Sequence, residues 1–147
     1  MASFTLTREI AAPVATVFDV LTDHARYAEI TPMRRSELER EGVPAPNGVG
    51  AIRKLTAIGP PLREEVIAYE APSRFSYTLL SGVPVRDHVG TVELAEEEGR
   101  TKMVYAVRTH PTLPVVGGLV VAVTKQAIKR LVDGIVKESE RRSAAGG

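Results

Sequence analysis

Apolar residues at the start of the chain change from an alternating to a helical period at Pro13. Between residues 3 and 11, apolar and polar side chains alternate loosely, which predicts a strand. After Pro13, the residues Val14, Val17, Phe18 and Leu21 are spaced as on one face of an amphipathic helix. Proline suits the first turn of a helix, because the N–H group that it lacks would have no partner there.

A second short helix is expected directly afterwards. Asp23 can cap it, Tyr27 and Ile30 would face inward, and Thr31-Pro32 would end it. The N-terminal segment therefore predicts one strand followed by two short helices.

Residues 33–110 carry closely spaced turn signals with short apolar runs between them. Glycine, proline and asparagine cluster at six places, and the runs between these places are rich in β-branched and aromatic residues. This spacing favours an antiparallel meander of about six strands.

The last part of the chain predicts one long helix. Apolar residues recur at helical spacing from Val116 to Ile135, Thr112 can cap the helix, and Pro114 lies early in it. We expect the helix to run from about Pro114 to Arg141, with residues 143–147 as a frayed tail.

Alternation along the later strands assigns side chains to the two faces of the sheet. Phe75, Tyr77 and Leu79 form the more apolar face of one strand, His88, Gly90 and Val92 share a face of the next, and Met103 and Tyr105 share a face of the last. A four-residue loop at 82–85 would pair Tyr77 with Gly90, and a loop at 96–101 would pair Val92 with Tyr105. All three inward faces then coincide.

In the runs at residues 49–58 and 62–70, the two faces of the expected strand are equally apolar. The alternation therefore leaves open whether Arg53 or Lys54, and Glu64 or Glu65, faces inward. A sheet with one apolar face and a long apolar-striped helix predicts an α+β domain with the helix on the sheet.

Composition narrows the possible functions. The 147 residues suit one domain, 19 Lys+Arg against 18 Asp+Glu give a net charge of +1, and there is no cysteine. We expect no nucleic-acid partner and no cofactor. The three histidines lie far apart in sequence, which predicts no metal site.

The N-terminus lacks the pattern of a signal peptide and no apolar run reaches about 18 residues, so we expect a cytoplasmic protein without a transmembrane segment.

Polar side chains on the inward face of the sheet are the candidate functional residues. Tyr77 and His88 are diagonal neighbours in the predicted register, and Tyr105 lies one strand further. They are either core residues satisfied by hydrogen bonds or the polar part of a small-molecule cavity. Asp87 and His88 are not predicted as a dyad, because adjacent strand residues face opposite ways. Arg108 and His110 are expected to face solvent without a function.

The order of elements resembles the helix-grip fold of the START-like (SRPBCC) superfamily, specifically the polyketide cyclase/dehydrase and lipid-transport family. The resemblance covers about residues 3–141. It is carried by residues 12–23 at the opening from strand to helix, by residues 69–77 at a mid-sheet turn, by Gly99-Arg100-Thr101 before a strand, and by the C-terminal helix. It implies a curved sheet of about seven strands that encloses a cavity with two short helices and a long C-terminal helix.

This resemblance implies an apolar ligand more firmly than it implies a reaction. We expect residues 1–147 to form a single ligand-binding domain, monomeric or homodimeric, that acts as a carrier or sensor of a lipid, sterol or polyketide-like molecule. The candidate binding residues are Tyr77, His88, Tyr105, Arg35, Phe75, Val92, Met103, Leu119 and Val123.

Two other functions remain open. One is a polyketide aromatase/cyclase or dehydratase, in which His88 or a tyrosine moves protons while Arg35 or Arg53 holds an enolate or carboxylate. The other is a protein-interaction module with a packed core.

Overall fold

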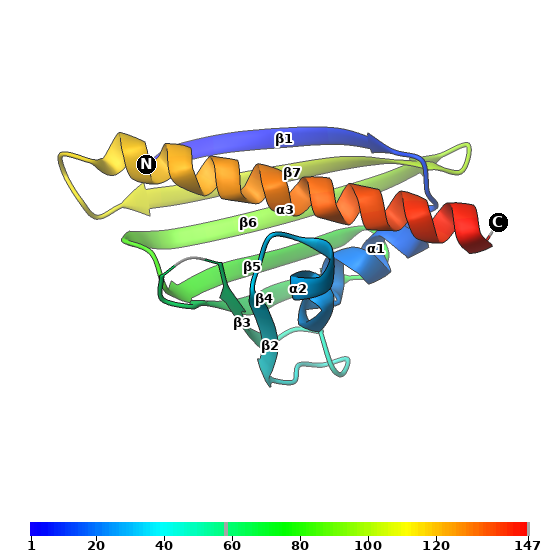
Figure 1. The fold of residues 1–147 in the computed structure, drawn as a ribbon, viewed down its shortest axis with the longest axis horizontal. Helices are drawn as coiled ribbons and strands as arrows, with labels where there is room; N and C mark the ends of the chain where they lie inside the picture. The colour runs from blue at the N-terminus through cyan, green and yellow to red at the C-terminus, as the bar shows by residue number, and fades with distance from the viewer. Residues whose placement is uncertain (58, 147) are drawn as a thin grey trace.

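The computed structural model describes residues 1–57 and 59–146 and contains one antiparallel sheet (Figure 1). Its strand order is β1-β7-β6-β5-β4-β3-β2. The strands are β1 (Ala2–Ile10), β2 (Arg35–Arg40), β3 (Ile52–Thr56), β4 (Leu62–Glu70), β5 (Arg74–Ser81), β6 (Val85–Glu97) and β7 (Arg100–Pro111). The expected α+β helix-grip fold and the six-strand meander are confirmed.

Three short elements connect β1 to β2: α1 (Val14–Thr22), η1 (His24–Arg26) and α2 (Tyr27–Ile30). The inward positions expected for Tyr27 and Ile30 are confirmed, since Tyr27 is buried and Ile30 packs against the core. The expected cap is not formed, because the Asp23 side chain makes no capping hydrogen bond. Its carboxylate instead lies 3.5 Å from the Arg26 guanidinium.

Pairing in the middle of the sheet follows the predicted register. Tyr77 lies opposite Gly90, and Val92 lies opposite Tyr105. The close approach of the Tyr77 ring requires a glycine at position 90, because a Cβ there would lie 2.4 Å from the ring. The hairpin between β6 and β7 is tighter than expected, since pairing continues to Glu97 and Arg100.

The helix α3 (Gly117–Gly146) crosses the sheet, and its C-terminal half lies beside α1 (Figure 1). Its buried residues are Ile128, Val132, Ile135 and Ser139, so no residue of the helix before Ile128 is fully buried. The helix begins three residues later than expected, because Thr112 does not cap it. The Thr112 N–H donates instead to the Pro84 carbonyl, 2.9 Å away, which ties this segment to the hairpin between β5 and β6.

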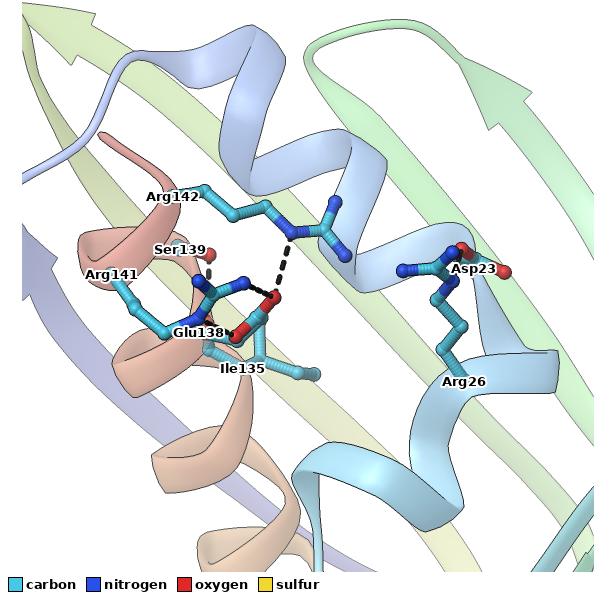
Figure 2. A network of polar contacts seen from close by, with 7 residues as sticks. All are labelled: Asp23, Arg26, Ile135, Glu138, Ser139, Arg141 and Arg142. Atoms are coloured by element: carbon cyan, nitrogen blue, oxygen red, sulfur yellow. Dashed lines mark hydrogen bonds and ion pairs between the residues drawn. The ribbon is translucent and has the colours of Figure 1, made fainter. Parts of the chain in front are cut away.

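The helix also continues past Arg141 to Gly146, so residues 143–146 are not the expected frayed tail, and Gly147 lies outside the described residues. Figure 2 shows Glu138 held by two arginines one turn further along. Arg141 donates two hydrogen bonds of 2.7 and 2.8 Å to it, and Arg142 donates one of 2.8 Å. These bonds lower the pKa of Glu138 to about 2. Such pairs three and four residues apart stabilise the last turns of a helix.

The contact between α3 and α2 depends on Gly134. A Cβ at this position would lie 2.3 Å from the Ile30 carbonyl oxygen, whereas a Cβ at Gly118, in the first turn of α3, would meet nothing within 4 Å. The two glycines therefore differ in what surrounds them although they share one helix.

We expect Gly134→Ala to lower the free energy of unfolding by about 1–3 kcal/mol, because the added methyl group must push α3 away from α2. Gly118→Ala is the matched control. It should raise the free energy of unfolding by about 0.5–1 kcal/mol, since alanine favours the helix and nothing obstructs it. Urea denaturation of both variants measures the two changes. An equal gain in both would contradict the close contact between α2 and α3.

Candidate functional site

Polar side chains are enclosed between the sheet and the helices, around a small cavity. The cavity volume is about 10 Å³, room for the centre of roughly one water molecule. Its lining residues are Leu21, His24, Tyr27, Arg53, Glu64, Phe75, Tyr77, Val92, Tyr105 and Leu131. Six of these ten carry a polar or charged group, so the cavity lies in a polar region of an otherwise apolar core.

An ion pair between neighbouring strands forms the charged part of this cluster. Arg53 on β3 lies directly opposite Glu64 on β4, and its Nη2 atom donates a 2.7 Å hydrogen bond to the Glu64 carboxylate. The Arg53 side chain is only 1% exposed. Its guanidinium also lies 5.2 Å from the centre of the Phe75 ring and 5.7 Å from that of Tyr77, within reach of cation–π attraction.

One donor atom of Arg53 makes no hydrogen bond with the described residues. The Nε atom is buried and has no hydrogen-bond partner within residues 1–57 and 59–146. A buried donor without an acceptor costs about 1–3 kcal/mol. An oxygen atom entering the cavity could satisfy it.

His24, from η1, accepts a second hydrogen bond from the Arg53 guanidinium. Its Nδ1 atom lies 3.0 Å from Arg53 Nη1, and its ring stacks on Phe75 with 5.3 Å between the ring centres. Because arginine only donates, His24 Nδ1 must be the acceptor. Burial, and next the Arg53 charge, lower the pKa of His24 well below its ordinary value, so the ring is neutral at pH 7.

Tyrosine hydroxyls form the other polar side of the cavity. The hydroxyl oxygens of Tyr77 and Tyr105 lie 2.6 Å apart, and the Tyr27 hydroxyl donates to the Leu21 carbonyl. Burial is the main cause that raises the pKa of all three tyrosines. They therefore stay protonated at neutral pH and can donate hydrogen bonds.

His88 lies on the inward face of β6, as expected. Its Nδ1 atom is 3.1 Å from the Thr109 hydroxyl, and its ring centre is 6.0 Å from that of Tyr77. Burial lowers the pKa of His88. His88 is not among the residues that line the small cavity.

The other expected binding residues fall into two groups. Phe75, Val92 and Met103 are buried on the inward face, and two of them, Phe75 and Val92, line the cavity. Leu119 and Val123 are 64% and 61% exposed, so the expectation that they face the interior is wrong. They lie on residues 117–127 of α3, before its first buried residue, Ile128.

Arg35 does not reach the interior either, so its expected place in the binding site is wrong. Its side chain is 71% exposed and pairs with Glu37 at 2.8 Å, outside the core. The arginine inside the core is Arg53, which the alternation left undecided against Lys54. Arg108, as expected, faces solvent, and neither it nor the half-buried His110 lines the cavity.

His24 was not predicted as a site residue. Its signal in the sequence is weak, because it follows the expected cap Asp23 and has no periodic partner. The described residues contain no group of three or more histidine, aspartate or glutamate side chains that could hold a metal ion. No helix among the described residues has the length and apolar character that crossing a bilayer requires.

The fold is the helix grip of the START-like (SRPBCC) superfamily. Residues 1–141 match the family described as polyketide cyclase/dehydrase and lipid transport, and the chain belongs to this family. No protein among the curated sequences matches the chain.

Solved structures share the fold at low sequence identity. A START superfamily protein from Mycobacterium smegmatis has a TM-score of 0.78 and 14% identity, covering 95% of this chain and 97% of that one. The ZhuI aromatase/cyclase from Streptomyces sp. R1128 has a TM-score of 0.78 and 23% identity, covering 99% and 98%. The di-domain ARO/CYC StfQ of the steffimycin biosynthetic pathway has a TM-score of 0.77 and 12% identity, covering 97% and 51%.

We expect Glu64→Leu to lower the free energy of unfolding by about 3–5 kcal/mol, because it leaves the buried Arg53 charge unpaired. The double variant Arg53→Met/Glu64→Leu should recover most of this loss, since it removes both charges. Glu39→Leu is the control, because Glu39 and Arg63 form a solvent-exposed ion pair of 2.6 Å. Its effect on the free energy of unfolding should be much smaller. Urea denaturation supplies all three values. A double variant no more stable than Glu64→Leu would contradict a buried ion pair.

Stability should also fall in mildly acidic solution. The unfolded chain binds protons at His24 and His88 below about pH 6.5, whereas the folded chain resists them because both pKa values are lowered. Stability is therefore fully present above about pH 6.5 and is lost as the pH falls below it, until the folded-state pKa is reached. Each pH unit in this window costs about 1.4 kcal/mol per histidine.

Denaturation at pH 7.5 and 5.0 measures this loss. Glu138 stays ionised in that range, because its pKa is about 2. His24→Gln keeps an acceptor for Arg53 and should lose less stability between the two pH values than the unmodified protein. An identical loss in both proteins would exclude His24 as a cause.

Proposed function

We propose that the protein binds an apolar small molecule with at least one polar oxygen between the sheet and α3, as a carrier or sensor. The observation that carries this proposal is the Arg53 Nε–H group, buried beside the cavity without an acceptor. Membership of a family described by polyketide cyclisation and lipid transport supports the apolar class of ligand.

Stability alone does not explain the cluster. Replacing a buried ion pair by apolar side chains of similar volume is often neutral or stabilising, so such a pair is weak evidence for a purely structural role. Perturbed ionisable groups gathered in one enclosed place are candidates for a functional site. His24, Tyr77 and Tyr105, whose pKa values are shifted mainly by burial, fit this description, and the Arg53–Glu64 ion pair lies beside them.

Charge balance indicates the kind of oxygen. The positive Arg53 already has its counter-ion in Glu64, while His24 and the tyrosines are neutral at pH 7. An anionic ligand would therefore bring an unmatched charge into the core, which is costly. A carbonyl, enol or hydroxyl oxygen could accept from Arg53 Nε without adding charge. We expect neutral ligands, such as sterols or polyketides, over fatty-acid anions.

The cavity must enlarge for such a ligand to enter. Small-molecule sites usually measure about 300–1,000 Å³, far more than the 10 Å³ of this cavity. The part of the fold best suited to move is the start of α3, residues 117–127, which contains no fully buried residue and carries Gly117-Gly118 in its first turn. Entry beneath this part would leave the packed remainder of the helix in place.

Two other functions have one supporting observation each. A cyclase or dehydratase is favoured by His88, which is neutral at pH 7 and lies beside Tyr77 on the inward face. An interaction module with a packed core is favoured by the small volume of the cavity. Cytoplasmic location and a monomeric or dimeric state stay predictions.

We expect a hydrophobic fluorescent probe to bind with micromolar affinity. At a hundredfold excess over its dissociation constant it should stabilise the fold by about 2.7 kcal/mol, which corresponds to a rise in Tm of roughly 5–10 °C. Leu131→Trp should abolish this rise, because Leu131 lines the cavity and a larger ring would fill it. Val49→Trp adds the same ring at an exposed position and should keep the rise.

Two results would decide between the three functions. A native mass spectrum of protein purified without detergent should show a bound small molecule. Turnover of a poly-β-keto thioester that His88→Ala abolishes would replace the carrier by the enzyme. If no probe raises Tm and no mass is added, the carrier and the enzyme are both excluded, and the interaction module remains.

A further inference from the structure

Large apolar side chains are exposed together where α3 begins. Val115 is 93% exposed, and four others within the same eleven residues are also exposed. We call this group the apolar end, and it consists of Leu113, Val115, Val116, Leu119 and Val123. Single exposed apolar residues are normal on protein surfaces, whereas a contiguous group marks an interaction surface.

The apolar end lies at one extremity of the molecule. The connection from β7 to α3 and the hairpin between β5 and β6 lie at the left of Figure 1, and the hydrogen bond from Thr112 to Pro84 joins them. Leu80 on this hairpin is exposed as well. Leu119 and Val123 are four residues apart, so they lie on one side of the helix, and Val115 precedes its first residue.

This side of α3 does not cover the core. Val120, Val121 and Thr124 on the same half are partly buried, while Leu119 and Val123 remain mostly exposed. The exposed sides of Leu119 and Val123 therefore add little to packing within the chain, although fully burying an exposed leucine or valine is worth about 1.5–3 kcal/mol.

Charge distinguishes the partner that this surface fits. Residues 111–124 carry no charged side chain, and residues 99–132 contain no aspartate or glutamate. The basic residues Lys125, Lys129 and Arg130 follow the apolar end on α3, and Arg108 is exposed on β7. On the adjoining hairpin, Asp87 lies 3.4 Å from Arg86, so this pair adds no net charge.

We infer that the apolar end docks on an anionic lipid surface. Its leucine and valine side chains enter the boundary between head groups and acyl chains, and Lys129 and Arg130 lie at the lipid phosphates. An apolar stripe flanked by basic residues is the arrangement that binds such surfaces. This inference rests on the surface residues alone and does not require the proposed cavity ligand.

A second copy of the chain fits the same surface less well. Pairing two apolar ends about a two-fold axis would bring the basic residues of both copies together. Because residues 99–132 supply no carboxylate, this approach would be repulsive. An anionic lipid surface provides the complementary charge that a second copy lacks.

Sedimentation with vesicles tests the inference. We expect binding to vesicles of phosphatidylcholine mixed with phosphatidylglycerol, little binding to phosphatidylcholine alone, and weaker binding at high salt. Leu119→Ser/Val123→Ser should weaken binding at least tenfold. Val49→Ser/Ile67→Ser is the matched control at exposed positions elsewhere and should bind as the unmodified protein does.

Neutralising the basic flank tests the charge contribution separately. Lys129→Gln/Arg130→Gln should weaken binding about twenty-five-fold, from about fivefold for each basic residue near the surface. Arg100→Gln/Lys102→Gln removes two exposed charges from the start of β7 and should have little effect. Thermal melting checks that each variant is folded.

Three outcomes would overturn the inference. One is the absence of binding to either vesicle, and another is equal weakening by the apolar-end variants and their controls. The third is a dimer in sedimentation velocity that Leu119→Ser dissociates, which would assign the apolar end to a second copy of the chain.

Discussion

The ion pair between Arg53 and Glu64 is the constraint on which the interior depends. Two charges removed from water are tolerated only when they meet in good geometry with further hydrogen bonds, and the 2.7 Å contact across adjacent strands provides the first of these. His24 then takes a second donor of Arg53, and the Phe75 and Tyr77 rings face its guanidinium. These groups satisfy the guanidinium except at Nε, which has no hydrogen-bond partner among the described residues.

The same pair explains which way β3 and β4 face. Arg53 lies opposite Glu64, whereas the neighbouring Lys54 lies opposite Arg63. Only the first of these cross-strand pairs combines opposite charges, so it is the one that the low-dielectric interior can accept. Alternation of apolar residues could not decide this, because Ile52 and Leu55 are both buried although they lie three positions apart in one strand.

Strands with short hairpins were predictable from the sequence. A tight turn fixes the register, and the register together with alternation placed Tyr77, His88 and Tyr105 on one buried face. Arg53 and Glu64 needed the pairing of two strands connected by a longer loop. His24 needed the position of a short helix relative to the sheet, which no periodicity encodes.

The helix α3 shows a different limit of sequence reasoning. Its apolar residues keep a helical period from Val116 to Ile135, and this period was interpreted as one continuous buried face. A period describes the helix alone and carries no information about how far the surface beneath it extends. Leu119 and Val123 continue the pattern of apolar residues but lie before the part of α3 that is buried.

The two parts of α3 therefore differ in the free energy that holds them to the domain. Residues 128–146 are fixed by Ile128, Val132 and Ile135 in the core, whereas residues 117–127 bury no side chain completely. A ligand that needs the cavity to open must meet the cost of moving part of the structure, and its apparent affinity falls by the fraction of molecules that are open. Movement of residues 117–127 alone keeps this cost low, because the large apolar side chains Leu119 and Val123 that they carry are already exposed.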